Sequence, residues 1–384
     1  MRTSPTAGER QGCGLSVICN LPPAAPEGRL FLAEPVSKEA ETELASGAGQ
    51  GSRVAPGRRG RFAVMELVSL AKNPVPSGAV VGALSSFDGT KLRCARWEAT
   101  RGPRRGTVCL FGGRGEPIEK YFEVIADLRR RGFAVAMMDW RGQGGSERKL
   151  SNPRKGHVRD FSEYDRDLLR FMKDVVLPDC PPPFIGLGHS MGGNILMRNG
   201  VLTGSWFERM VLTAPMIAFN EARIGYPQNI VRLYAEAGSL AGLSTSYVKG
   251  GSDDPEELSA PFDGNPLTSD RERWMRSKAV IEAAPHLALG SPTIGWLRAA
   301  YRSCQRLSQS RYPQSVRVPM LLFAAGNDKI VSSRAIEDFG VRLKVGTQLL
   351  LPGSRHEILM EADVIRQRFW AAFDAYLGVN VAAA

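Results

Sequence analysis

The segment Phe184–Asn194 constrains the fold of this chain more than any other part of the sequence. An apolar run leads into Gly-His-Ser-Met-Gly at residues 188–192, and helix-forming sequence follows. A strand that turns sharply into a helix strains the residue at the turn and crowds its neighbours, so glycine is needed two positions before and two positions after it. Gly188 and Gly192 meet that need. The pattern predicts that Ser190 presents its hydroxyl above a sheet as a nucleophile.

Short apolar runs alternate with helical patterns on both sides of this turn. Strands are predicted at Ala79–Leu84, Leu92–Trp97, Thr107–Phe111, Ala134–Asp139, Phe184–Leu187, Met210–Thr213, Met320–Ala324 and Gln348–Leu351, and helices at about 117–131, at about 161–176 and from Met191. Strands that alternate with helices form a mostly parallel sheet covered on both faces. This context favours a nucleophile turn over the alternative, a glycine-rich turn with an incidental serine.

Two segments break this alternation. Residues 1–64 are rich in Gly, Ala, Pro, Ser and Glu without periodicity, which predicts a disordered extension. An alternative is that natural translation begins at Met65. Residues 216–315 contain helical pieces separated by polar loops, and we expect them to form a helical cap over the carboxyl edge of the sheet, where ligands bind in such folds. The α/β core is then predicted to comprise residues 65–215 and 316–384.

A serine hydroxyl needs a neighbouring base, which is usually histidine. The chain has four histidines. His189 adjoins the serine inside the turn, His157 precedes it in a loop, and His286 lies in the expected cap. His356 follows a strand and precedes a helix, so its loop can bring the imidazole over the sheet edge. We therefore predict His356 as the general base.

The acid is expected between the serine and the histidine in chain order. Asp328 follows the apolar strand pattern of residues 319–325 within Gly-Asn-Asp. A carboxylate at the end of a strand can orient the imidazole and stabilise its charged form. Asp338 and Asp363 are alternatives, but both fall within helical patterns, where an exposed helix residue is expected.

Acyl transfer places negative charge on a carbonyl oxygen, which requires preorganised N–H donors. The N–H of Met191, directly after the serine, is one predicted donor. The second is expected from Gly-Gly-Arg-Gly-Glu at residues 112–116, with Arg114 N–H preferred and Gly113 N–H as the alternative. The polar loop at residues 139–146 is expected to brace the nucleophile turn. Three apolar residues at helical spacing either line an acyl pocket or form the core of the cap: Trp296, Leu297 and Tyr301.

Composition bears mainly on partners and location. The formal net charge of +11 can attract nucleic acid, anionic lipid or acidic substrates. The sequence has no zinc-finger spacing, RNA-binding aromatic motif or long Lys/Arg run, so we expect no nucleic-acid partner. Peripheral contact with an anionic membrane remains an expectation. Six cysteines without a CxxC pair favour a reducing, cytoplasmic location, and no apolar run reaches the roughly 18 residues of a membrane span.

Residues 78–377 resemble the bacterial lysophospholipase and monoacylglycerol lipase family of α/β-hydrolases. The likeness rests on Gly-Arg-Gly-Glu at 113–116 with Glu-Lys-Tyr at 119–121, Asp-Trp-Arg-Gly-Gln-Gly-Gly-Ser at 139–146, Gly-His-Ser-Met-Gly-Gly at 188–193, Gly-Asn-Asp at 326–328 and His-Glu at 356–357. The resemblance implies a serine hydrolase that cleaves a fatty-acyl ester of a single-chain glycerolipid without cofactor or metal. It implies Ser190, Asp328 and His356 as the triad, and Arg114 and Met191 as oxyanion donors.

Two positions depart from the monoacylglycerol lipase pattern. Those enzymes usually have His-Gly where this chain has Gly112-Gly113, and commonly have His where Gln143 stands. Both differences are closer to the lysophospholipases. The alternatives are a small-ester carboxylesterase or aminopeptidase of the same fold, and a non-catalytic α/β-hydrolase that acts as an interaction module. The intact serine, acid and histidine in the expected order weigh against the last alternative.

Overall fold

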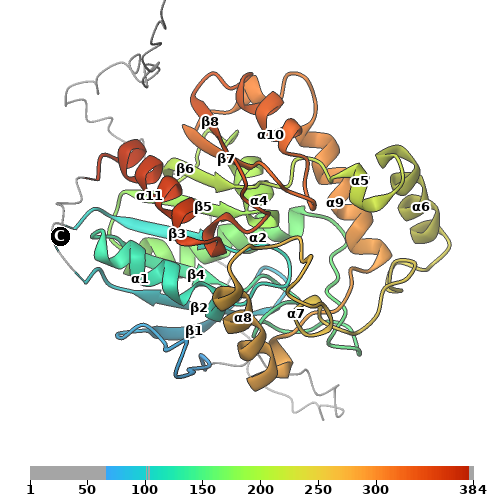
Figure 1. Ribbon diagram of the computed structural model, residues 1–384, viewed down its shortest axis with the longest axis horizontal. Helices are drawn as coiled ribbons and strands as arrows, with labels where there is room; N and C mark the ends of the chain where they lie inside the picture. Colours follow the sequence, from blue (N-terminus) through green and yellow to red (C-terminus); the bar gives the residue numbers. More distant parts are fainter. Residues whose placement is uncertain (1–65, 101, 103, 380–384) are drawn as a thin grey trace, which may run out of the picture. The chain divides into compact units, whose positions relative to one another are not determined.

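The structure is a computed structural model that describes residues 66–100, 102 and 104–379 (Figure 1). The expectations for residues 1–64, for a start at Met65 and for Cys13 and Cys19 lie outside the described residues. The other four cysteines, at positions 94, 109, 180 and 304, are buried free thiols. No helix within the described part of the chain is long and apolar enough to cross a membrane.

Eight strands form one sheet in the order β1-β2-β4-β3-β5-β6-β7-β8. β1 (Val80–Ser85) and β2 (Lys91–Trp97) form an antiparallel hairpin, and β2 also pairs antiparallel with β4. The other pairings are parallel and involve β3 (Thr107–Phe111), β4 (Ala134–Met138), β5 (Phe184–His189), β6 (Phe207–Thr213), β7 (Met320–Ala325) and β8 (Gly346–Leu351). The predicted α/β class with a mostly parallel sheet is confirmed.

The central strands are mostly apolar and are buried along their whole length. Every residue of β3, β4, β5 and β7 is buried, as expected for parallel strands that carry helices on both faces. β3 and β5 are neighbours, and Phe111 at the end of β3 pairs with Gly188. The loop after β3 and the turn after β5 therefore leave the same edge of the sheet side by side.

Helices cover both faces of this sheet (Figure 1). α1 (Phe122–Arg130), which follows the 3-10 turn Ile118–Tyr121, lies beside α11 (Asp363–Leu377) on one face. The second face carries α2 (Ser162–Phe171), α4 (Met191–Asn199) and α10 (Ser333–Gly340). The single helix predicted over 161–176 contains a π-helical stretch, Met172–Val176, and continues into the short α3 (Leu177–Asp179). Periodicity over so few residues does not distinguish a π turn from an α turn.

Most of the chain between β6 and β7 is helical or in turns. It contains α5 (Glu221–Ile224), α6 (Gln228–Leu240), α7 (Glu256–Ser259), α8 (Arg271–Ala283), α9 (Ile294–Leu307) and the 3-10 turns Pro285–Leu287 and Pro313–Ser315. α9 packs against both α4 and α6, and it contributes Trp296, Ala299, Ala300, Cys304 and Leu307 to the main core. α8 and the following turn form a second, small apolar cluster. The cap boundaries at 216 and 315 remain predictions.

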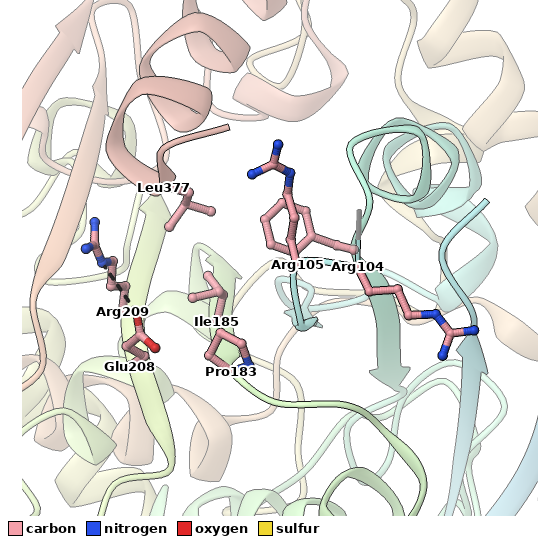
Figure 2. Close-up of a pocket in the computed structure, with 8 residues that line it drawn as sticks. Arg104, Arg105, Pro183, Ile185, Glu208, Arg209 and Leu377 are labelled. Carbon is pink, nitrogen blue, oxygen red and sulfur yellow. Dashed lines mark ion pairs between the residues drawn. The ribbon is translucent and has the colours of Figure 1, made fainter. Parts of the chain in front are cut away.

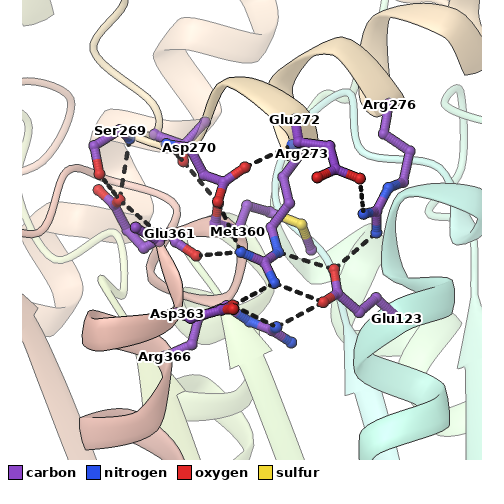
Figure 3. A network of polar contacts seen from close by, with 12 residues as sticks. Glu123, Ser269, Asp270, Glu272, Arg273, Arg276, Met360, Glu361, Asp363 and Arg366 are labelled. Carbon is purple, nitrogen blue, oxygen red and sulfur yellow. Dashed lines mark hydrogen bonds and ion pairs between the residues drawn. The ribbon is translucent and has the colours of Figure 1, made fainter.

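A polar network fixes α8 to the helices α1 and α11 (Figure 3). The buried guanidinium of Arg273 donates to the carboxylates of Glu123 at 2.7 Å and Asp363 at 2.7 Å. It also donates to the Glu361 carbonyl at 3.0 Å. Arg366 of α11 bonds the same Glu123 carboxylate at 2.7 Å. One arginine thus joins three segments that are distant in sequence.

Candidate active site

Ser190 lies in a strained turn between β5 and α4. Its backbone has φ 51° and ψ −113°, a conformation that residues other than glycine rarely adopt. A Cβ atom at Gly192 would lie 2.3 Å from the Phe111 carbonyl oxygen, and one at Gly188 would lie 2.9 Å from the Gly193 nitrogen. Glycine at these two positions therefore lets the turn approach β3 and its own helix closely, which fixes the Ser190 hydroxyl above the sheet edge.

Ser190, His356 and Asp328 form a continuous hydrogen-bonded chain. His356 Nε2 lies 3.0 Å from Ser190 Oγ, and His356 Nδ1 lies 2.7 Å from Asp328 Oδ2. The three residues follow β5, β8 and β7, so they meet at the carboxyl edge of the sheet. Their exposed fractions are only 8%, 4% and 7%. This arrangement can transfer a proton from the serine hydroxyl to a neutral imidazole that a carboxylate orients.

The electrostatics of the pair favour a charged imidazole beside a carboxylate. Burial disfavours the ionised form of Asp328, but the charge and hydrogen bond of His356 and the N–H groups of Val331 and Ile330 outweigh it and lower the pKa of Asp328. Burial likewise opposes the charge on His356, but Asp328 raises the pKa of His356 above its ordinary value. The Asp328 side chain is held by those two N–H groups, at 3.0 and 2.7 Å.

The other candidate bases and acids lie away from the serine hydroxyl. His189 Nδ1 faces the Thr213 carbonyl oxygen at 3.1 Å, and His157 Nδ1 lies 3.0 Å from Thr293 Oγ1. His286 lies in the 3-10 turn after α8. Asp338 and Asp363 are exposed residues of α10 and α11. The structure brings none of these five side chains into hydrogen bonding with Ser190 Oγ.

The loop at residues 112–116 follows β3 and lies beside the nucleophile turn. The Gly113 N–H donates to the carboxylate of Glu116 within the same loop. The Gly115 N–H donates to Gln143 Oε1 at 2.6 Å. The Arg114 guanidinium donates to the Gly290 carbonyl at 2.8 Å. The two N–H groups that flank Arg114 are thus committed to side-chain acceptors, which counts against Gly113 as an oxyanion donor.

Met191 is the first residue of α4. The N–H groups in the first turn of a helix have no acceptor within that helix, and the helix dipole favours negative charge beside them. The Met191 N–H therefore has the chemistry of an anion donor next to Ser190.

The polar loop at residues 139–146 braces mainly the loop after β3, not the nucleophile turn. Trp140 Nε1 donates to the Gly112 carbonyl at 3.0 Å, and Gln143 accepts from Gly115 as described above. Its bond toward the nucleophile turn is the 3.8 Å contact between Gln143 Nε2 and Met191 Sδ. The expectation that this loop braces the nucleophile turn thus holds only indirectly, because a sequence does not reveal which of two adjacent loops a side chain contacts.

A buried ionic cluster beside His356 was not predicted. Glu116 Oε1 accepts from Lys120 Nζ at 2.8 Å, and Lys120 Nζ also bonds Glu357 Oε1 at 2.5 Å. Burial raises the pKa of Glu357, whereas Lys120 and other neighbours overcome burial and lower the pKa of Glu116. The sequence signal was a Glu and Lys four positions apart, a spacing that is more typical of a solvated helix face.

Two of the three apolar residues considered for an acyl pocket, Trp296 and Tyr301, are packed into the protein interior, whereas Leu297 is partly exposed. Trp296 Nε1 donates to Tyr164 Oη at 3.3 Å, and the Arg114 guanidinium lies over its ring. Tyr301 is buried against the ring of Phe219. These contacts fit the alternative that they form core, and an acyl-pocket role for Trp296, Leu297 and Tyr301 stays a prediction.

A cavity of about 310 Å³ lies near the amino ends of the central strands (Figure 2), whereas Ser190 follows the carboxyl end of β5. It is surrounded by residues at the amino ends of β3, β5 and β6 and by the end of α11. The lining residues are Arg104, Arg105, Phe133, Pro183, Ile185, Glu208, Arg209 and Leu377. Within the described residues, no group of three or more His, Cys, Asp or Glu side chains could hold a metal ion.

Comparisons with known proteins find relatives of similar sequence and fold. Residues 102–363 match the family described as serine aminopeptidase, S33. The chain is 31% identical to lysophospholipase L2 of Escherichia coli strain K12, over 73% of this chain and 82% of that protein. It is 28% identical to a monoacylglycerol lipase of Mycolicibacterium smegmatis, over 70% and 86%.

The fold is also similar to that of a soluble variant of monoglyceride lipase from Saccharomyces cerevisiae, solved with a substrate analog. The TM-score is 0.62 at 20% identity, over 79% of this chain and 97% of that one. At this identity the likeness supports the fold alone.

Proposed function

We propose that this chain, which belongs to the S33 serine aminopeptidase family of α/β-hydrolases, is a serine hydrolase that cleaves the fatty-acyl ester of a single-chain glycerolipid. The observation that carries the proposal is the chain of hydrogen bonds from Ser190 through His356 to Asp328. The named activities of the lysophospholipase and monoacylglycerol lipase relatives support the substrate class. Lysophospholipase activity is the form we favour, since that relative shares the highest identity of those compared above.

In the proposed reaction, Ser190 Oγ attacks the ester carbonyl carbon while His356 Nε2 takes the hydroxyl proton. The tetrahedral intermediate collapses, its bond to the glycerol oxygen breaks, and His356 gives that proton to the leaving alcohol. Water then attacks the acyl-Ser190 carbonyl and loses a proton to His356. The fatty acid leaves, and the proton returns to Ser190. Asp328 keeps Nδ1 protonated and stabilises the imidazolium at both stages.

The negative charge of each tetrahedral intermediate needs donors that are in place before the reaction. We assign this role to the N–H groups of Met191 and Arg114. The start of α4 favours an anion beside Met191, and the two N–H groups that flank Arg114 have other acceptors. No cofactor is required by this chemistry.

The test is fatty-acid release from lysophosphatidylethanolamine and from monoacylglycerol, measured side by side for the wild type and Ser190→Ala. We expect release from at least one lipid by the wild type and none by the variant. The preferred lipid identifies the branch of the family. A folded wild-type protein that releases fatty acid from neither lipid would refute the proposal and direct attention to small esters and peptides.

We further propose peripheral contact with an anionic lipid surface through α6. Ile230, Leu233 and Leu240 are exposed on one face of this helix, with exposed fractions of 49%, 65% and 83%. The opposite face buries Ala235, where α6 packs on α9. An apolar face on an exposed helix, in a chain of net charge +11, fits adsorption to a membrane that contains the lipid substrate.

A further inference from the structure

We propose that Glu116 is a positioning residue for acyl transfer at Ser190. Its carboxylate holds the loop at residues 112–116 in the conformation that presents the Arg114 N–H to the reacting carbonyl. The inference rests on the proposed function only in requiring a tetrahedral intermediate at Ser190, whichever ester supplies it.

The carboxylate of Glu116 folds back onto its own loop. It accepts the Gly113 N–H, and a Cβ atom at Gly113 would lie 2.8 Å from the same carboxylate oxygen. A larger residue at position 113 would therefore push the Glu116 carboxylate away from the loop. With the Gly113 N–H bound to Glu116 and the Gly115 N–H bound to Gln143, the peptide units 112–113 and 114–115 are both anchored. The unit 113–114, which carries the Arg114 N–H, lies between these two anchors, and they restrict its direction.

The charge of Glu116 is maintained by its neighbours. Burial alone would raise the pKa of this carboxyl, but Lys120 Nζ at 2.8 Å and Tyr121 Oη at 2.6 Å stabilise the anion, and the pKa of Glu116 lies well below its ordinary value. Glu116 is therefore an ionised acceptor at neutral pH. Hydrogen bonds to an ionised acceptor are shorter and stronger than those between neutral groups, so this anchor holds the loop more firmly than a neutral side chain would.

Lys120 connects the loop at residues 112–116, called the oxyanion loop below, to the loop that carries His356. Its Nζ bonds both Glu116 and Glu357, and Glu357 directly follows His356. The loop that presents the oxyanion donor and the loop that presents the base are therefore joined by one buried ammonium group. Removal of Glu116 releases the Gly113 anchor and leaves Lys120 with Glu357 as its remaining carboxylate partner among the described residues.

The experiment compares Glu116→Ala, Glu116→Gln and a matched control, Asp167→Asn. Asp167 is also a buried carboxylate, but it bonds Ser86 and Arg141 and does not contact the oxyanion loop. Two measurements are made: kcat and KM on p-nitrophenyl butyrate, and the rate at which a fluorophosphonate labels Ser190. Neither depends on the identity of the natural lipid.

We expect Glu116→Ala to lower kcat and the labelling rate by about 30- to 100-fold, because the loss of one oxyanion donor costs about 10²–10³ in kcat. KM should change by less than about threefold, since the donor acts mainly on the transition state. Glu116→Gln keeps an oxygen acceptor for the Gly113 N–H, so its kcat should be at least about tenfold higher than that of Glu116→Ala. Asp167→Asn should lower Tm while kcat stays within about threefold of wild type, as for a purely structural change.

Either of two results would overturn the proposal: a kcat of Glu116→Ala within threefold of wild type, or equal losses in Glu116→Ala and Glu116→Gln. If Glu116→Ala does not fold, Glu116→Asp decides, because it keeps the charge beside Lys120 but shortens the reach to Gly113. A tenfold or larger loss of kcat then supports the proposal, and a smaller loss contradicts it.

The same assays separate this inference from the proposed function. If the wild type hydrolyses p-nitrophenyl butyrate but releases no fatty acid from either lipid, the lipid function fails and the Glu116 comparison still decides the inference. If Ser190 is not labelled in a folded wild type, both are refuted.

Discussion

The imidazole of His189 lies against that of His356, with ring centroids 4.8 Å apart. Burial, opposed in part by Glu116, lowers the pKa of His189 to about 4. Asp328 has the opposite effect on His356 and raises its pKa above the ordinary value. The pKa values of these two neighbouring histidines are therefore shifted in opposite directions from the ordinary value.

The first prediction concerns the pH dependence of kcat/KM on a soluble ester. His356 must be uncharged to accept the Ser190 proton, so kcat/KM should fall as the pH drops through the pKa of His356. That midpoint should lie above the ordinary histidine value of about 6.5. Asp328→Asn should move the midpoint to lower pH and reduce the plateau by up to about 10⁴-fold. An acidic limb centred near pH 4 would instead assign the titration to His189.

The second prediction concerns the strained backbone of Ser190. Ser190→Gly and Ser190→Ala should both abolish hydrolysis, but the glycine variant should be more stable than the alanine variant by about 1 kcal/mol. Glycine adopts the φ of 51° without a Cβ penalty, and its greater freedom in the unfolded chain offsets only part of that gain. Urea unfolding of the two variants measures the difference. Equal stabilities would mean that the turn carries no strain.

A third prediction concerns the network in Figure 3. Arg273→Met should lower the free energy of unfolding by about 1–3 kcal/mol, because it removes a buried guanidinium that bonds three carboxylates and a carbonyl. Arg276→Met is the matched control, since Arg276 bonds the same Glu123 carboxylate from a more exposed position. It should cost less than about 1 kcal/mol. Urea unfolding measures both free energies of unfolding. If the two variants lose similar amounts of stability, the buried contacts of Arg273 contribute no more than the more exposed contact of Arg276, and the prediction is wrong.

The fourth prediction tests the apolar face of α6. The double variant Leu233→Ser and Leu240→Ser should bind vesicles of phosphatidylglycerol and phosphatidylcholine at least about tenfold more weakly than wild type. The reason is that partial burial of each leucine side chain in the lipid surface contributes about 1 kcal/mol or more to the binding free energy, and serine does not. Val341→Ser alters an exposed apolar residue outside α6 and serves as the control. Sedimentation with vesicles gives the affinities. If the double variant binds as well as the control, α6 is not the contact surface.

The strands were predictable because their signal is local. Buried parallel strands are continuous apolar runs, so β3 at Thr107–Phe111 and β4 at Ala134–Met138 fall within a residue of their predicted bounds. The nucleophile turn is also local, since its glycines stand at fixed distances from Ser190. Candidates for the base could be ranked because only four histidines exist.

The contacts of the site were less predictable because they join distant segments. Glu116 and Lys120 are close in sequence, but their burial depends on Glu357, which lies 237 residues from Lys120. The orientation of the Gly113 N–H depends on a side chain that could equally have pointed to solvent. Periodicity also assigned Trp296 and Tyr301 equally well to a pocket or to a core, because both arrangements bury one face of a helix.

The hydrogen bond between His356 and Ser190 spans 166 positions of the chain. Loop closure over such a distance is entropically costly and occurs only once most of the sheet is assembled. A partly folded chain that has formed β3, β4 and β5 therefore has the nucleophile but no base. Recovery of esterase activity after dilution from urea should therefore lag behind recovery of secondary structure. Esterase activity then indicates that folding is complete.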